Sequence, residues 1–317
     1  MRTIEVVGSV VCALLFTSGC NREVADQAGR PTVALVLKTL NSPFFIDMQR
    51  GAREAAEREN VGLLVQAAER EVDVEKQMQI IENLIQTGVK VLCITPSGSK
   101  EIVPAIAKAN RAGIPVIIVD TRVDEAAAAE AGVRTETFIG SDNYEGGRLA
   151  GQYLREQSGG KARVAVLEGI PGHETGDSRL SGFRDALQDA PDVRVVASQP
   201  ANWERDQGFN VLQNLLQAHP DIDWVFACND MMALGAVEAI AAARKEGQIR
   251  VVGFDAVEDA RTAMAEGSMM ASVAQFPGEM GRVAVETAAR LLRGEQPPEL
   301  QLVRIEMVTK ETLGPQP

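Results

Sequence analysis

The chain has 317 residues, of which 45% are hydrophobic, 24% are charged and only 4% are aromatic. This length suffices for about two globular domains, and the composition excludes a disordered chain, a collagen-like fibre and a protein with many membrane spans. A formal net charge of −12 repels a polyanion over most of the surface, so we expect no nucleic-acid partner.

The first residues have the pattern of a bacterial export signal. Arg2 precedes an apolar run over residues 6–16, and small residues then lead to Cys20. A run of this length fits the central part of a signal peptide and is too short for a permanent membrane span. We therefore predict a signal peptide over residues 1–19.

Cys20 resembles the lipidated cysteine of a bacterial lipobox. The match is incomplete, because Thr17 stands where that motif prefers leucine. We predict a lipid on Cys20 and a lipid-attached linker over residues 20–31, which would anchor the protein to the membrane. The alternative is ordinary cleavage nearby and a freely soluble protein.

From Pro31 onward, short apolar runs alternate with amphipathic segments. The predicted strands cover residues 33–37, 63–66, 89–94, 115–119, 162–167, 193–197, 224–228, 250–254 and 269–274. The predicted helices cover residues 45–59, 73–86, 99–112, 143–156, 178–188, 205–217, 231–245, 258–265 and 277–292. Apolar strands alternating with helices specify parallel sheets covered on both faces, and so many elements leave two sheets or one barrel.

A pattern that occurs twice along the chain favours two sheets. Residues 91–120 and 224–255 both read as a strand, a polar turn, a helix and a second strand, and these end in Asp120 and Asp255. Ligands of open α/β sheets bind at this carboxyl edge. We therefore expect the two carboxylates to face one cleft, the alternative being that each merely caps a loop or a helix.

Motifs of catalysis are missing from the sequence. There is no phosphate-binding P-loop, no dinucleotide-binding glycine motif and no nucleophile elbow. The two histidines, His173 and His219, are far apart in sequence, and Cys93 and Cys228 lie in apolar runs typical of buried residues. We expect no catalytic residue, no cofactor, no disulfide framework and no metal site.

The scarce aromatic residues gather in loops that follow strands. Phe44 and Phe45 follow a proline-fixed turn after the first strand, and Trp203 lies in a polar loop after another. Flat rings stack on the apolar faces of a pyranose, while Asp, Asn, Gln and Arg side chains hydrogen-bond to its hydroxyls. The pattern favours a sugar site, although Phe45 could belong to the core and Trp203 could pack beneath its loop.

Short segments spread over residues 32–310 carry a resemblance to a known family. They are residues 40–45 (LNSPFF), 141–143 (SDN), 198–201 (SQPA), 218–221 (AHPD), 229–236 (NDMMALGA), 252–255 (VGFD) and 274–277 (AQFP). With them the chain resembles periplasmic sugar-binding proteins of the ribose/galactose receptor family. The resemblance implies an α/β fold of the type 1 periplasmic binding protein: two Rossmann-like three-layer lobes joined by three hinge crossings. The implied lobes cover residues 32–140 plus 276–304 and residues 141–275 plus 305–317.

The resemblance also implies a function. It describes a monomeric receptor in the periplasm, or lipid-anchored at the outer face of the cell membrane, that closes on a monosaccharide and delivers it to an ABC permease. The implied ligand contacts combine stacking rings with polar groups. They are Ser42, Phe44, Phe45, Asp120, Thr121, His173, Arg179, Trp203, Asn229, Asp255 and Gln275.

Departures from the family pattern leave the sugar open. Ser42 stands where ribose receptors have asparagine, and Thr121 and Asp177 stand where they have arginine. Conversely, His173 and Arg179 match hydroxyl-binding positions of the glucose/galactose receptors. The resemblance therefore implies a ribose-, glucose- or galactose-like pyranose without choosing among them.

Three alternatives compete with an import receptor. A chemosensory or sensor co-receptor would use the same lobes with a different protein partner. A transcription regulator would need a basic headpiece where the export signal stands. An exported sugar hydrolase could use Asp120 and Asp255 as an acid/base pair, but the sequence gives no reason for their pKa values to differ.

Overall fold

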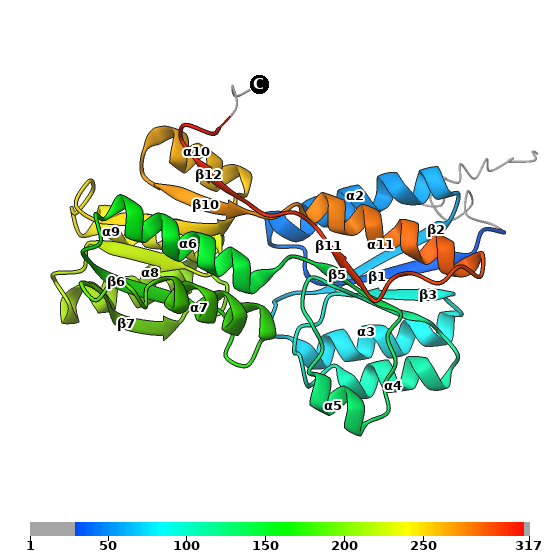
Figure 1. The fold of residues 1–317 in the computed structure, drawn as a ribbon. Helices are drawn as coiled ribbons and strands as arrows, with labels where there is room; N and C mark the ends of the chain where they lie inside the picture. Colours follow the sequence, from blue (N-terminus) through cyan, green and yellow to red (C-terminus); the bar gives the residue numbers. More distant parts are fainter. Residues whose placement is uncertain (1–28, 314–317) are drawn as a thin grey trace, which may run out of the picture. The chain divides into compact units, whose positions relative to one another are not determined.

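The structure, a computed structural model, describes residues 29–313, and residues 31–317 form one compact unit. The predicted signal peptide over residues 1–19 and the predicted lipid site at Cys20 lie outside the described residues. Within that unit the chain builds two six-stranded sheets, each with its own helices (Figure 1).

The first sheet is entirely parallel. Its strands, in spatial order, are β11 (Leu300–Leu302), β5 (Thr137–Gly140), β4 (Val116–Val119), β3 (Val91–Ile94), β1 (Thr32–Thr39) and β2 (Gly62–Ala68). The central strands are buried on both faces, as their continuous β-branched sequences predict.

The second sheet repeats this arrangement with one antiparallel edge. Its strands, in spatial order, are β12 (Glu306–Thr309), β10 (Ala271–Ala274), β9 (Arg250–Asp255), β8 (Trp224–Ala227), β6 (Ala162–Glu168) and β7 (Val193–Pro200). Only β12 runs against its neighbour β10.

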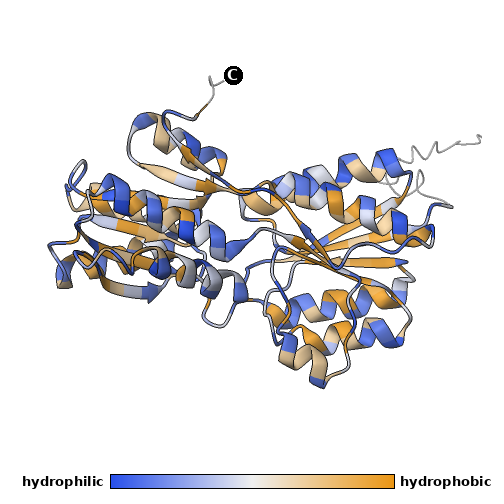
Figure 2. Ribbon diagram, in the orientation of Figure 1, coloured by the Kyte–Doolittle hydropathy of each residue, from blue (hydrophilic) through white to orange (hydrophobic). Residues whose placement is uncertain are grey.

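Helices supply the remaining layers, and Figure 2 shows apolar strands beneath helices with alternating apolar and polar residues. The first lobe carries α2 (Pro43–Glu59), α3 (Val74–Thr87), α4 (Val103–Arg111), α5 (Glu125–Glu130) and α11 (Pro277–Leu292). The second lobe carries α6 (Asn143–Gln157), α7 (Glu174–Ala186), α8 (Arg205–Ala218), α9 (Asp230–Ala242) and α10 (Glu258–Glu266).

Alternation along β1 separates the two cores of the first lobe. Val33 and Leu35 pack with α2 and α11, whereas Ala34 and Val36 pack with α3 and α4. In the second lobe, α6 packs with α7 and α8 with α9, and their buried side chains share one core with the strands.

The chain passes between the sheets at three places within residues 29–313: between β5 and α6, between β10 and α11, and between β11 and β12. Each sheet is therefore assembled from segments that are distant in sequence. Figure 1 shows the three connections side by side at the junction of the lobes. The two-lobed α/β fold expected from the family resemblance is confirmed.

The structure contains every predicted strand and helix and adds four elements that the pattern did not reveal. These are β5, β11, β12 and the short helix α5. Two helix starts also differ. Helix α4 begins at Val103 rather than at residue 99, with a proline in its first turn, and α7 begins at Glu174 rather than at residue 178.

Candidate functional site

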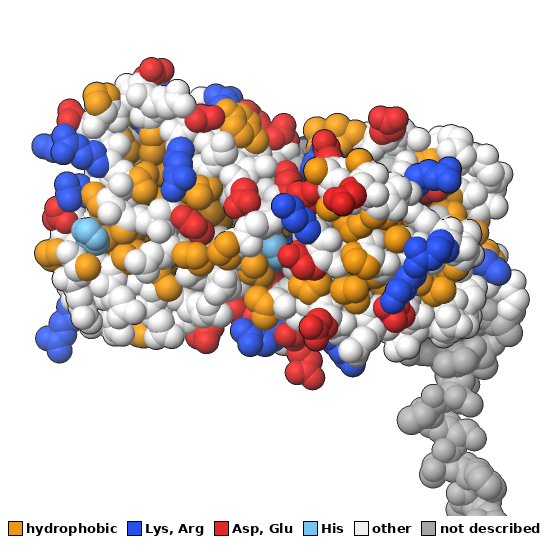
Figure 3. Space-filling view, turned by 90° about the horizontal axis from the view of Figure 1, so that it is seen from below, with side chains coloured by type: hydrophobic (Ala, Val, Ile, Leu, Met, Phe, Trp, Pro, Cys, Tyr) orange, Lys and Arg blue, Asp and Glu red, His pale blue; other side chains and the backbone are white. Residues whose placement is uncertain are grey.

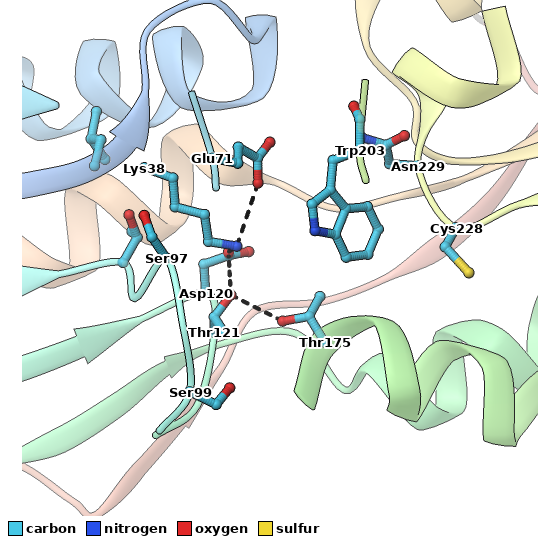
Figure 4. Close-up of polar contacts among 12 residues, drawn as sticks. Lys38, Glu71, Ser97, Ser99, Asp120, Thr121, Thr175, Trp203, Cys228 and Asn229 are labelled. Carbon is cyan, nitrogen blue, oxygen red and sulfur yellow. Dashed lines mark hydrogen bonds and ion pairs between the residues drawn. The ribbon is translucent and has the colours of Figure 1, made fainter. Parts of the chain in front are cut away.

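Loops at the carboxyl ends of strands in both sheets converge on one cavity. Asp120 directly follows β4, Asp255 ends β9, and Gln275 follows β10. The cavity is lined by residues of both lobes, namely Lys38, Ser42, Phe44, Phe45, Glu71, Asp120, Thr175, Arg179, Trp203, Asn229, Asp255 and Gln275. Of these, Figure 4 labels Lys38, Glu71, Asp120, Thr175, Trp203 and Asn229.

Strained backbone marks this site. Asp120, Trp203 and Asp255 have positive φ angles of 66°, 68° and 115°, a region that non-glycine residues rarely adopt. Such conformations cost about 1–3 kcal/mol each and persist only where the surroundings fix them. All three residues line the cavity, Asp120 and Asp255 at the ends of β4 and β9 and Trp203 in the loop after β7.

A buried charge cluster belongs to the first lobe. Nζ of Lys38 lies 3.3 Å from Oδ2 of Asp120 and 3.7 Å from Oε2 of Glu71. The Lys38 and Asp120 side chains are only 3% and 5% exposed. Burial raises the pKa of Glu71 to about 7, because the shared ammonium only partly offsets the loss of water.

The second lobe presents its own cation and carboxylate. Arg179 donates from Nε to Oδ1 of Asn143 (2.9 Å) and from Nη1 to the carbonyl of Cys228 (2.7 Å). Its Nη1 also lies 3.7 Å from Oδ1 of Asp255. Burial raises the pKa of Asp255 to about 6, against the opposing effect of Arg179 and of the hydrogen bond from Gln275 (2.7 Å).

Asn229 is held at the start of α9. Its Oδ1 accepts the backbone N–H of Met232 (2.9 Å), which caps the helix, and its Nδ2 donates to the carbonyl of Trp203 (3.1 Å). Each side-chain atom retains capacity for a further hydrogen bond toward the cavity.

Aromatic side chains close the cavity from both lobes. The rings of Phe44 and Phe45 meet edge to face, with centroids 5.1 Å apart. Both follow Ser42, which stands at the N-cap position of α2 without a capping bond from its side chain. Trp203 approaches from the second lobe and is 5% exposed.

Residues 33–296 match the family described as "Periplasmic binding protein domain". The chain belongs to this family. The ribose import binding protein of Escherichia coli is 38% identical, with 90% of this chain and 93% of that protein covered. The D-ribose/D-allose-binding protein of Pseudomonas aeruginosa is 36% identical, with 86% of each chain covered.

A solved structure supports the same relationship. The periplasmic solute-binding protein of an ABC transporter from Actinobacillus succinogenes, with bound D-allose, superposes with a TM-score of 0.84 at 39% sequence identity. The match covers 89% of this chain and 98% of that one. The family expected from the sequence is thereby confirmed.

Nine of the eleven sequence-predicted ligand contacts line the cavity, and the structure places Thr121 and His173 outside its lining. Thr121 donates from Oγ1 to Oδ2 of Asp120 (2.9 Å) and lies 3.0 Å from Oγ1 of Thr175. His173 is buried at the N-cap of α7, and this burial lowers its pKa to about 4.

Three cavity-lining residues, Lys38, Glu71 and Thr175, were missed from the sequence. A lysine within an otherwise apolar and buried strand is itself a signal, because a buried ammonium needs a partner. Glu71 and Thr175 lie in or next to polar loops, where nothing in the sequence separates them from exposed neighbours. Among the described residues there is neither a metal-binding cluster nor a helix long and apolar enough to cross a membrane.

Proposed function

We propose that this chain is an extracytoplasmic receptor that binds one uncharged monosaccharide between its lobes and delivers it to an ABC importer in the inner membrane. The observation that carries the proposal is the convergence of rings and polar groups from both lobes on one buried cavity. Phe44 and Asp120 come from the first lobe, and Trp203 and Asp255 come from the second.

The chemistry of the lining suits a sugar. The aromatic side chains offer apolar surface to its C–H faces, and the acids, amides and cations hydrogen-bond to its hydroxyls. The cations Lys38 and Arg179 are each already paired with carboxylates of their own lobe. An anionic ligand would therefore have to compete with buried carboxylates, which favours a neutral one.

We propose an aldopyranose of the ribose or allose type as the ligand. The related proteins from E. coli and P. aeruginosa are named for ribose and for ribose and allose, and the superposed structure holds D-allose. The superposed structure holds D-allose, and Ser42 and Thr121 replace two expected ribose contacts, so we take D-allose as the first candidate.

Binding requires the lobes to open. Asp120 and Trp203, 4% and 5% exposed, are inaccessible to a ligand in the present arrangement. Contacts between the lobes hold it: Thr121 with Thr175, and the hydroxyl of Ser99 with the backbone N–H of Glu174 (3.3 Å). We infer that the lobes rotate about the three crossings, and that a sugar touching both lobes favours the closed state.

The proposal includes the cellular location. A signal peptide over residues 1–19 and a lipid on Cys20 would hold a monomeric receptor at the outer face of the cell membrane, beside its permease. Metabolic labelling with a fatty-acid probe tests the anchor: Cys20→Ser should abolish the label.

On the face seen in Figure 3, acidic and basic side chains are interspersed, an arrangement that suits a protein without a nucleic-acid partner.

A thermal-shift screen tests the function. D-allose, D-ribose, D-glucose and D-galactose are added to the purified protein, and the unfolding temperature is compared with that in buffer alone. We expect stabilisation by D-allose above the others, with each sugar recovered unchanged. The proposed function would be contradicted if none of the four sugars stabilised the protein, or if the protein consumed one of them.

A further inference from the structure

The indole of Trp203 is fixed in position by glycines of its own lobe. A Cβ atom placed on Gly169 would lie 2.0 Å from Cζ2 of the indole, and one on Gly176 would lie 3.2 Å from Cη2. The ring therefore packs directly on backbone at Gly169, where any larger residue would push it away. The Arg179 guanidinium lies 5.7 Å from the ring centroid. These neighbours leave the indole little freedom to turn.

The nitrogen of this fixed ring is a buried donor without a protein acceptor. Nε1 of Trp203 is shielded from solvent and has no hydrogen-bond partner among residues 29–313. Figure 4 shows the nitrogen edge of the indole turned toward the side of the cavity where Lys38, Glu71 and Asp120 lie. An indole N–H is a donor only, and leaving it unpaired in a buried place is costly.

The carboxylates of the cavity are already engaged by other donors. Oδ2 of Asp120 accepts from Thr121 and pairs with Lys38, and Oε2 of Glu71 faces the same ammonium. Oδ1 of Asp255 accepts from Gln275. The donors and cations of each lobe thus engage the acids of that lobe, and the indole N–H is left facing the cavity.

We propose that Trp203 recognises the ligand through its indole N–H, which donates a hydrogen bond to one oxygen of the sugar. This assignment rests on the proposed function and adds to it a specificity rule. Because the indole N–H can only donate, the sugar must present a hydroxyl or a ring oxygen at that position. An analogue in which this oxygen is missing should bind more weakly. Stacking alone would not discriminate in this way.

The chain offers a clean test, because it contains only two tryptophans. Trp224 lies in β8, is 2% exposed and is absent from the cavity lining. In a Trp224→Phe background, position 203 can be filled with tryptophan or with 3-benzothienylalanine, which keeps the shape and the aromatic faces of the side chain but replaces N–H by sulfur. Titration calorimetry with D-allose then compares the two proteins.

We expect the benzothienyl protein to bind D-allose about tenfold or more weakly than the tryptophan protein, as the loss of a buried hydrogen bond predicts. Equal affinity of the two proteins would overturn the assignment, since the ring would then act by stacking alone. If the tryptophan protein bound no sugar at all, the proposed function would fail first and this assignment with it.

Trp203→Phe in the otherwise unchanged chain gives a second readout that does not depend on the Trp224 variant. Its affinity is measured for D-allose, for each monodeoxy analogue and for the carbocyclic analogue in which CH2 replaces the ring oxygen. We expect the loss caused by Trp203→Phe to be clearly smaller for one analogue, the one that lacks the accepting oxygen, than for D-allose and the rest. A loss of the same size for every analogue and for D-allose would contradict the assignment.

Discussion

Lys38 and Asp120 form a buried ion pair, 3.3 Å apart, at the carboxyl edge of the first sheet. The second sheet repeats the arrangement with Arg179 and Asp255, 3.7 Å apart. Each lobe thus brings one cation and one strand-end carboxylate to the cavity. Because each pair is satisfied within its own lobe, the lobes can separate without leaving either charge unpaired, as hinge opening requires.

Lys38→Met should destabilise the first lobe and weaken ligand binding. Removing the ammonium leaves Asp120 and Glu71 buried without a counter-charge, a type of change that costs about 3–5 kcal/mol. Urea unfolding should therefore show a lower free energy of unfolding. The exposed Lys90, changed to Met, is the matched control and should leave both stability and affinity unchanged. A wild-type unfolding midpoint for Lys38→Met would show that the pair contributes nothing.

Asp255→Ala should lose most of the sugar affinity while the fold survives. Asp255 is a buried acid whose charged form is disfavoured by burial, and Arg179 keeps its hydrogen bonds to Asn143 and Cys228, so the protein should still fold without this carboxylate. Its loss deprives the ligand of an acceptor and leaves Arg179 without its carboxylate. We expect at least a hundredfold weaker binding of D-allose by calorimetry, with cooperative unfolding retained. Asp259→Ala, at an exposed position, serves as control; wild-type affinity in Asp255→Ala would exclude it from the site.

Glu71 should make stability fall as pH rises. Burial raises its pKa from 4.5 to about 7, so the folded state holds a proton that the unfolded chain has already lost. The stabilising contribution is fully present below pH 4.5 and is lost as the pH rises through 7. Four charged groups act on this carboxyl, namely Lys38, Asp120, Asp255 and Glu204.

Glu71→Gln isolates this effect. His173 acts in the opposite direction between pH 4 and 6.5, because burial lowers its pKa, and Asp255 acts in the same direction as Glu71 up to about pH 6. Between pH 6.5 and 7 Glu71 is the group among these three that still titrates. Unfolding temperatures measured from pH 4.5 to 8 should fall less steeply in Glu71→Gln than in the wild type. Identical slopes would contradict the buried, protonated state of Glu71.

Gly169→Ala should displace the Trp203 indole. The added methyl group would lie 2.0 Å from the ring, so the side chain must move out of its place in the cavity wall. We expect weaker D-allose binding and an altered tryptophan emission spectrum. In a Trp224→Phe background the emission reports Trp203 alone. An unchanged spectrum together with unchanged affinity would mean that the ring is not held as described.

The sequence predicts the fold well where an element is buried on both faces and therefore has a continuous run of apolar residues. The apolar run over residues 33–37 predicts β1 because both faces of that strand are covered. Strand β11 is missed because it has three residues and exposes Leu300 and Leu302 at the edge of its sheet, so its pattern resembles a loop. The strand is recognisable only from its pairing with β5.

The sequence predicts some residues of the candidate site and misses others. Asp120 and Asp255 were found because each follows an apolar strand, where parallel sheets bind ligands. Lys38 was missed because a charge near a strand end resembles the beginning of a solvent-exposed loop, whereas its partners Asp120 and Glu71 come from distant parts of the sequence. His173 lies buried at the N-cap position of α7, outside the cavity lining, and its residue type and spacing do not reveal this placement.

We propose that one sugar binds between the lobes and leaves unchanged. Titration calorimetry of the purified full chain with D-allose, followed by recovery of the sugar, measures this most directly. We predict saturable binding of one D-allose per chain and quantitative recovery of intact sugar. The proposed function would be contradicted if the protein bound none of D-allose, D-ribose, D-glucose and D-galactose, or if it converted the sugar during the titration.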